Sequence, residues 1–564
     1  MILVFMVLID YICEISKSLY MKNNKFIAIV VLSCLCLVSN AQLLRTTVQQ
    51  GELEGVEQNG LAYYKGIPFA QPPVGNLRWK APLPPKAWVG TYKADTFKDK
   101  PYQQSRRAPL PGQPGVSEDC LYLNVLTPAK RAGEGLPVLV WIHGGGFNTG
   151  ASWEQNGEKF AQAGIVYAAI TYRTNAFGFL SLPELSQESA KETGRAISGN
   201  YGLMDQIAAL QWIHENISAF GGDPEKVTIM GESAGAISVA MLCQSPLAKG
   251  LFRGAISESG GNMVPVDNIR IDNNSIRNVR GSEVYGKAYL TRMGMGKLKL
   301  KDLRKQDPEK FMGDPIAFGA GGALWPTYDD YVLMSDPYKL YEEGNYNDVN
   351  VLIGTNSDEG SMFTGILGRF TPEQYEQEMK ESFPDPVWQQ KFRKMYPGST
   401  LQEAYDAHSD IFREAAFAWP TYAWANLQSK NSAEGKGKGK VYMFFFNHAK
   451  QNFFRRGQQT DRQQLTMHAG ELGLTFGQLG GFGGTPNPSD EALSRLVMQY
   501  WINFIKTGDP NGGYLPYWPE YAKDTETVMN FRDGAYLTPI PNKPQLELWE
   551  DYMQWRRTHQ TPLK

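Results

Sequence analysis

A serine between two glycines stands at the centre of this sequence. Residues 231–235 read Gly-Glu-Ser-Ala-Gly; the short run 226–230 before them is typical of a buried strand, and 234–242 is typical of a helix. A G-x-S-x-G pattern between a strand and a helix predicts a sharp turn that presents the serine hydroxyl. The helix N-terminus also favours the negative charge that develops when a hydroxyl attacks a carbonyl. The pattern therefore predicts that Ser233 is a nucleophile.

A serine nucleophile needs a base to take its proton and an acid to orient that base. The sequence has 6 histidines, of which His468 lies in a glycine-containing stretch late in the chain. The order serine, acid, histidine is that of hydrolases with a G-x-S-x-G turn. The acid should follow a buried strand, and the apolar run 349–354 leads into Asp358 and Glu359. The residue pattern does not choose between these two, and a solvated loop carboxylate is the alternative for each.

Donors for the negatively charged oxygen of a tetrahedral intermediate are the third requirement. Residues 143–147, His-Gly-Gly-Gly-Phe, follow the apolar run 138–142, and backbone without side chains can turn its N–H groups into a site. A plain tight turn or a weak phosphate loop would use the same residues. No P-loop lysine, G-x-G-x-x-G or H-E-x-x-H pattern is present, and no Cys/His pairs have metal-ligand spacing. We therefore expect no cofactor and no metal.

The stretches that must position these residues alternate between strands and helices. Apolar runs typical of buried strands are 138–142, 165–172, 254–259, 349–354 and 441–446. Apolar residues at helical spacing predict helices at 200–220, across much of 370–428, and after Ser489, which is the expected cap of the last one. Such alternation indicates an α/β fold with a mostly parallel sheet covered on both faces. No repeat or clear linker divides the chain, so one large domain with insertions is expected.

Together these residues resemble the type-B carboxylesterase family, which includes cholinesterases and bacterial carboxylesterases. The resemblance runs from about Gly55 to Trp549 and rests on a set of motifs: G-I-P-F-A-Q-P-P-V-G at 66–75, S-E-D-C-L-Y-L-N-V at 117–125, H-G-G-G-F at 143–147, F-G-G-D-P at 220–224, G-E-S-A-G at 231–235, D-E-G at 358–360 and G-D-P-N at 508–511. It implies an α/β-hydrolase fold and ester hydrolysis through an acyl-enzyme.

The resemblance also implies roles for single residues. It places the catalytic acid at Glu359, the base at His468, and the oxyanion donors at Gly145, Gly146 and Ala234. Three residues match positions that support the triad: Glu232, Ser259 and Glu471. Two pairs match buried ion pairs that hold structure rather than do chemistry: Arg78 with Glu118, and Arg173 with Asp205.

Two departures from the family pattern bear on the substrate. Cys120 matches one half of a family disulfide, but Pro101 stands at the partner position, and the loop between them lacks the tryptophan with which cholinesterases hold a quaternary ammonium. Met362 replaces an aromatic residue at the choline site, although Phe363 follows it. These differences argue against a cholinesterase.

The N-terminal residues predict export. Lys22 and Lys25 precede the apolar run 26–38, and 39–41 resembles a small-residue cleavage site. We therefore interpret 1–20 as a non-native upstream extension, 21–41 as a signal peptide and 42–564 as a single mature domain, secreted or periplasmic. A lipid anchor at Cys34 is a minor alternative. The mature chain would have no integral membrane segment and only two cysteines, Cys120 and Cys243, too few for a disulfide framework.

Composition is consistent with a globular enzyme. Hydrophobic residues make up 42% of the chain, enough for a large core, and a formal net charge of −2 does not suggest a nucleic-acid partner. The function expected from the sequence is that of an exported serine carboxylesterase acting on small, uncharged esters. The alternatives are a catalytically inactive binding or adhesion module of the same fold, or an amidase or transacylase with the same triad. The presence of Ser233, Glu359 and His468 favours an enzyme.

Overall fold

The computed structural model describes residues 42–104, 113–264, 277–312, 324–334, 336–364, 370–448, 465–480 and 487–559. The predicted signal peptide and the extension before it lie outside the described residues, so both stay predictions.

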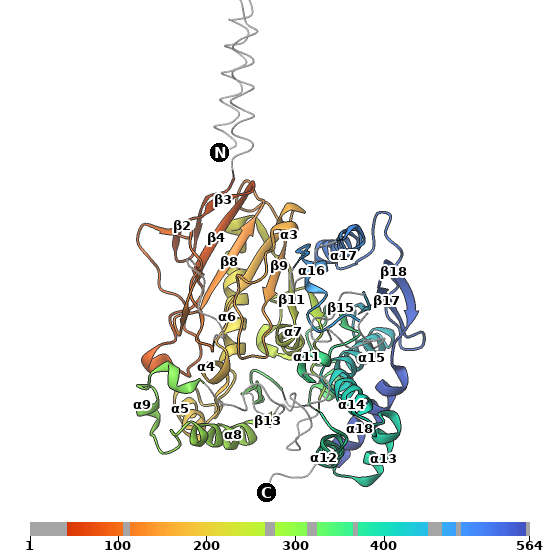
Figure 1. The fold of residues 1–564 in the computed structure, drawn as a ribbon. Coiled ribbons are helices and arrows are strands. Elements are labelled where there is room, and N and C mark those ends of the chain that lie inside the picture. The colour runs from red at the N-terminus through yellow and green to blue at the C-terminus, as the bar shows by residue number, and fades with distance from the viewer. Residues whose placement is uncertain are drawn as a thin grey trace, which may run out of the picture.

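A single large sheet runs through the molecule (Figure 1). Within the described residues its strand order is β18-β17-β16-β15-β12-β11-β9-β10-β8-β4-β3. The strands from β17 to β10 in that order are parallel to their neighbours, and the strands at both edges pair antiparallel. The bounds are β3 Val56–Gln58, β4 Leu61–Pro68, β8 Tyr122–Thr127, β9 Leu136–Ile142, β10 Val166–Ile170, β11 Gly222–Glu232, β12 Gly254–Glu258, β15 Asn350–Asn356, β16 Val441–Phe446, β17 Thr527–Phe531 and β18 Ala535–Pro539.

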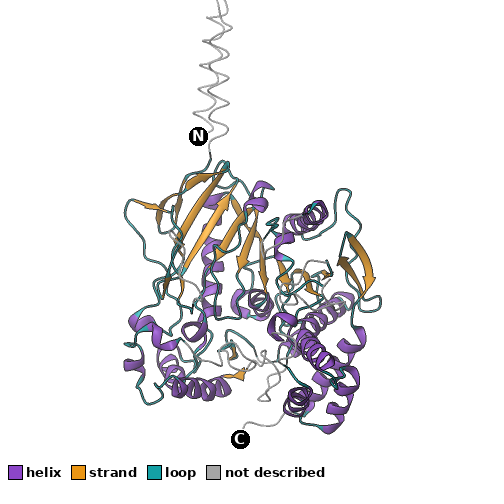
Figure 2. Cartoon of the chain, in the orientation of Figure 1, coloured by secondary structure: helices purple, strands orange, loops and turns teal. Residues whose placement is uncertain are grey.

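Smaller sheets and many helices surround this sheet (Figure 2). The short strands are β1 Arg45–Val48, β2 Gly51–Glu54, β5 Thr91–Lys93, β6 Lys100–Pro101, β7 Val116–Ser117, β13 Arg277–Asn278 and β14 Thr327–Tyr328. The α-helices are α3 Glu158–Gln162, α4 Asn175–Phe179, α5 Pro183–Thr193, α6 Tyr201–Asn216, α7 Ala234–Gln244, α8 Val279–Arg292, α9 Leu300–Leu303, α10 Pro337–Glu343, α11 Ser361–Thr364, α12 Pro372–Ser382, α13 Pro386–Met395, α14 Leu401–Arg413, α15 Trp419–Ala433, α16 Leu472–Thr475, α17 Pro488–Thr507 and α18 Lys543–Thr558.

The central parallel strands contain apolar runs because both of their faces are buried. In β9, Val138, Val140 and Ile142 belong to one hydrophobic core, whereas Leu139 and Trp141 belong to a second core on the opposite face. Residues of α6 and α7 complete the first core, and residues of α17 complete the second. The predicted mostly parallel sheet with two covered faces is thus confirmed.

The cap expected for α17 was wrong by two residues. Asn487, not Ser489, caps this helix: its side chain accepts a hydrogen bond from the Asp490 N–H, and the Asp490 side chain accepts one from the Asn487 N–H. Pro488 occupies the first turn, where its missing N–H is not needed.

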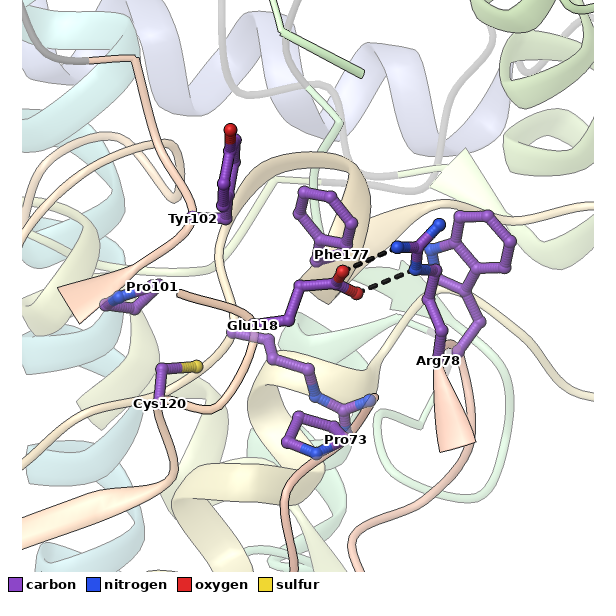
Figure 3. Close-up of a pocket in the computed structure, with 9 residues that line it drawn as sticks. Pro73, Arg78, Pro101, Tyr102, Glu118, Cys120 and Phe177 are labelled. Carbon is purple, nitrogen blue, oxygen red and sulfur yellow. Dashed lines mark hydrogen bonds and ion pairs between the residues drawn. The ribbon is translucent and has the colours of Figure 1, made fainter. Parts of the chain in front are cut away.

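The two ion pairs expected from the family resemblance are present; the Arg173–Asp205 pair is buried, and the Arg78–Glu118 pair is partly buried. Arg173 donates to both carboxylate oxygens of Asp205, at 2.8 and 2.7 Å. Arg78 binds Glu118 in the same two-fold manner, beside a small cavity that Pro101 and Cys120 also line (Figure 3). This cavity contains none of the predicted catalytic residues.

The strand order brings the predicted site residues to one edge of the sheet. β9, β11, β12 and β15 are parallel neighbours, so their carboxyl ends lie side by side. The glycine loop 143–147 follows β9, Ser233 follows β11, Ser259 follows β12, and Glu359 lies in the turn after β15. In α/β folds this is the edge at which ligands bind.

Candidate active site

Ser233 lies in a strained turn between β11 and α7. Its φ is 56° and its ψ is −126°, a conformation that costs free energy for a residue with a side chain. A Cβ on Gly231 would lie 2.4 Å from the Gly235 carbonyl carbon, and a Cβ on Gly235 would lie 2.1 Å from the Ile142 oxygen. Both glycines of the motif are therefore required by close backbone packing. The Ser233 N–H donates to the Glu258 carbonyl oxygen at 3.0 Å, which ties the turn to β12.

Glu359 and His468 are in direct contact. His468 Nδ1 lies 2.6 Å from Glu359 Oε2, while Glu359 Oε1 accepts hydrogen bonds from the Ser259 hydroxyl and from the Asn356 N–H, both at 2.6 Å. Each carboxylate oxygen therefore faces a donor, and the Glu359 side chain is fully buried. Asp358 instead forms a backbone bridge to Met467. Of the two acids that the residue pattern left open, the structure brings Glu359 to the histidine.

The other ring nitrogen of His468 is available. Nε2 has no hydrogen-bond partner among the described residues, although Glu232 Oε1 approaches it to 3.2 Å. Burial opposes a charge on the ring, but the carboxylates of Glu232 and Glu359 outweigh burial and raise the His468 pKa to about 9. The imidazole stacks on the Phe417 ring, with centroids 4.6 Å apart. The partly exposed ring of Phe363 has its centroid 5.1 Å from that of the imidazole, and we call Phe363, Phe412 and Phe417 the phenylalanine cluster.

The glycine loop packs against the serine turn. A Cβ on Gly144 would lie 3.2 Å from the Ser233 Cβ and 2.6 Å from the Glu232 carbonyl oxygen. Gly145 and Gly146 have φ values of 98° and 62°, which L side chains rarely adopt. Ala234 is the first residue of α7, so its N–H has no acceptor within the helix. The predicted oxyanion donors thus lie in two backbone segments that meet at Ser233.

Buried carboxyl groups surround the acid and the base. Burial raises the pKa of Glu232 to about 7 and that of Glu471 to about 8, and it also raises the pKa of Glu258. Glu471 accepts a hydrogen bond from the Asn356 side chain, and Glu258 accepts one from Trp501 Nε1 at 2.8 Å. These carboxyl groups bind protons more readily than exposed ones, which limits the negative charge around His468 near neutral pH.

Three residues of this site were not found from the sequence. Asn356 contacts both Glu359 and Glu471, and Phe417 stacks on His468. Glu258 is a further buried carboxyl group beside Glu232 and Glu471. Asn356 could have been predicted to lie near the acid, because it ends the strand that precedes Glu359. The other two could not be predicted from the sequence, since their positions depend on how distant segments pack.

Within the described residues, Cys120 and Cys243 are free and buried. Across the described residues, no three His, Cys, Asp or Glu side chains are grouped so as to hold a metal ion. Nor does any helix within the ranges given above have the length and apolar character needed to cross a bilayer.

The chain is similar in sequence and in fold to known esterases. The sequence model of a family described as "Carboxylesterase family" matches residues 42–549. A fumonisin B1 esterase of Sphingopyxis macrogoltabida is 33% identical, and the match covers 87% of this chain and 86% of that protein. A para-nitrobenzyl esterase of Bacillus subtilis is 33% identical, over 89% of this chain and 96% of its own. A solved structure titled PNB esterase superposes with a TM-score of 0.73 at 31% identity, over 89% of this chain and 99% of that one.

Proposed function

The chain belongs to the carboxylesterase family, has the α/β-hydrolase fold and is a carboxylic ester hydrolase; from this premise we propose that it is an exported serine esterase whose nucleophile is Ser233. The mature protein would be residues 42–564, a single catalytic domain, released from the signal peptide 21–41. Its substrates would be small, uncharged esters.

Acylation begins at Ser233. His468 Nε2 takes the hydroxyl proton while Oγ attacks the ester carbonyl carbon, and the carbonyl oxygen becomes negatively charged. The N–H groups of Gly145, Gly146 and Ala234 would stabilise this oxyanion. When the carbon–oxygen bond to the alcohol breaks, His468 returns the proton to the leaving alcohol, and the acyl group stays on Ser233.

Deacylation repeats the sequence with water. His468 Nε2 accepts a proton from the water that attacks the acyl carbon, and it then protonates Oγ as the carboxylic acid leaves. In both halves the imidazole becomes transiently positive. Glu359 accepts from Nδ1–H throughout, so it holds the ring and stabilises that charge.

The observation that best supports this proposal is the contact between His468 Nδ1 and Glu359 at 2.6 Å, with Nε2 left without a hydrogen-bond partner in the described part of the chain. With Nδ1 held by Glu359, Nε2 is the ring nitrogen that can accept the Ser233 proton. The protonation of Glu232 affects the pKa of the base. When this carboxyl group takes a proton, with a pKa of about 7, one of the charges that raise the His468 pKa is removed.

The apolar surface near the base supports uncharged substrates. Met362 and Phe363 are 36% and 44% exposed, and Phe363 contacts the His468 ring. The relatives named para-nitrobenzyl esterase and fumonisin B1 esterase indicate that ester substrates differ widely within this family.

The test is hydrolysis of a neutral phenyl ester by the purified mature protein. We expect turnover by the wild type and a loss of kcat of about 10⁴-fold or more in Ser233→Ala, with an unchanged circular dichroism spectrum. Ser189→Ala, in the distant helix α5, is the control and should be fully active. An inactive wild type would favour a binding module; turnover by Ser233→Ala would mean that another residue is the nucleophile.

A further inference from the structure

An irregular helical turn lies beside the acid and the base. α14 and α15 are joined without a break by the π-helical segment η5, Glu414–Ala418. A π-helical turn contains an extra residue, which rotates the side chains that follow it relative to those before. Such turns are rare and often occur at functional sites.

The part of this helix before the π-helical turn packs against the loop that carries Glu359. Arg413 Nη1 donates to the Ser357 carbonyl oxygen at 3.2 Å. A Cβ on Gly360 would lie only 1.9 Å from the Ser409 carbonyl oxygen, so the helix backbone touches this loop directly. α11, which follows Glu359, also contacts α14 (Figure 1).

The π-helical turn itself contacts the base. Phe417, 4% exposed, stacks on His468 with ring centroids 4.6 Å apart and an interplanar angle of 27°. A second phenylalanine of the cluster, Phe412, stacks on Phe363 at 4.6 Å, and no ring contact between it and His468 is found among the described residues. The extra residue therefore lets one helix contact the acid loop through Ser409 and Arg413 and the base through Phe417.

We propose that Phe417, placed by the π-helical turn, is a positioning residue whose ring face holds the His468 imidazole and favours its positively charged form during ester hydrolysis. This inference rests on the proposed function, in which His468 becomes positive in each half-reaction. The face of an aromatic ring carries partial negative charge, so a cation within about 6 Å of the ring centroid is attracted to it, more strongly when water is excluded.

The charged groups around His468 are carboxyl groups, and of the two rings that contact the imidazole Phe417 is the stacked one, at 4.6 Å, whereas Phe363 is tilted at 5.1 Å. From the other elements, four carboxyl groups face the imidazole or its partners: Glu232, Glu258, Glu359 and Glu471. On the helix itself the charges are largely paired, because Arg413 binds Asp410 at 3.0 Å and Glu414 at 2.6 Å. The group that the helix presents to the imidazole is therefore the aromatic face.

The first experiment changes the charge of the ring face and leaves its shape nearly unchanged. Phe417 is replaced in the full mature protein by phenylalanines with one, two and three ring fluorines, which progressively remove the negative face. We expect the acid-limb pKa of kcat/KM, and the His468 pKa measured by NMR, to fall stepwise by about 0.5 to 1 unit in total. An unchanged pKa across the series would overturn the proposal, because a ring that only fills space is insensitive to fluorination.

The second experiment removes the ring. Phe417→Leu should lower kcat/KM about tenfold with a lower acid-limb pKa, and Phe417→Tyr should restore both. Phe412→Leu is the matched control: its ring packs edge-on against Phe417 at 5.9 Å and stacks on Phe363 at 4.6 Å, but no ring contact with His468 is found among the described residues, so its removal should shift the acid-limb pKa much less than Phe417→Leu. Equal pKa shifts in the two leucine variants would overturn the proposal. These outcomes are separate from a failure of the proposed function, because the NMR pKa of His468 does not depend on turnover.

Discussion

Replacement of Glu359 by glutamine tests the hydrogen bonds between the acid and the base, because it keeps the size of the side chain and changes only its charge and one acceptor. Glu359 Oε1 accepts from the Asn356 N–H and the Ser259 hydroxyl, each at 2.6 Å. The backbone N–H can only donate, so in Glu359→Gln the amide oxygen must take this position. The amide NH₂ then faces His468 Nδ1 and donates to it. The proton of a neutral imidazole is thereby forced onto Nε2, which can no longer accept the proton of Ser233.

The expected loss follows from this change of tautomer. We expect kcat to fall about 10⁴-fold, equivalent to about 5 kcal/mol of transition-state stabilisation, while KM for a neutral ester changes little. The assay is steady-state hydrolysis of a p-nitrophenyl ester near neutral pH, together with a thermal melt that confirms folding. The isosteric substitution should leave the melting temperature close to that of the wild type.

Asp358→Asn is the control for this experiment. Asp358 is next to Glu359 in sequence and is buried like it. It contacts Met467, the residue before His468, through its backbone, and asparagine keeps that backbone bridge. We expect only a small change in kcat. If Asp358→Asn proves more damaging than Glu359→Gln, or if Glu359→Gln keeps more than a tenth of the activity, the tautomer argument is wrong.

The remaining predictions concern thiols, pH and substrate charge. Thiol titration of the denatured, unreduced mature protein should give two groups, from Cys120 and Cys243, and reductant should not change the melting temperature; zero thiols would reveal a disulfide. Burial raises the Glu471 pKa from its ordinary value to about 8. The folded state therefore binds this proton more tightly than the unfolded chain, and the associated stability is lost as pH rises from about 4.5 to 8. Between pH 5 and pH 8, the free energy of unfolding measured with urea should fall less in Glu471→Gln than in the wild type. An equal fall in the two proteins would mean that Glu471 does not hold a proton in the folded state. Because Met362 offers no aromatic face and the loop between Pro101 and Cys120 lacks a tryptophan, kcat/KM should be higher for a neutral butyrate ester than for butyrylcholine of matched reactivity; a tenfold choline preference would contradict this.

Much of the fold was predictable because most of the parallel strands contain a continuous apolar run. The run 441–446 coincides with β16, and the strand before the serine was found, although β11 begins four residues earlier than expected. The order of the strands was not predictable from these runs, since any buried strand can pair with any other. It is this order that places the ends of β9, β11, β12 and β15 side by side.

The residues of the site were likewise predictable only in part. Ser233 and the glycine loop could be located because backbone geometry dictates their glycines, as the close contacts at Gly231 and Gly235 show. The choice between Asp358 and Glu359 needed the family resemblance, because a one-residue difference in a turn decides which side chain points to the base. Phe417 was beyond prediction, since the preceding residues are helical by pattern and give no sign of the extra residue in the π-helical turn.

The central claim, that Ser233 forms the acyl-enzyme, is tested most directly by covalent trapping. A phosphonate ester reacts with an activated serine and mimics the tetrahedral intermediate. Incubation of the mature protein with such a reagent, followed by digestion and mass spectrometry, should place one adduct on the peptide that contains Ser233. Labelling should require His468, so His468→Ala should remain unmodified. Stoichiometric labelling at any other residue, or equally fast labelling of His468→Ala, would contradict the mechanism.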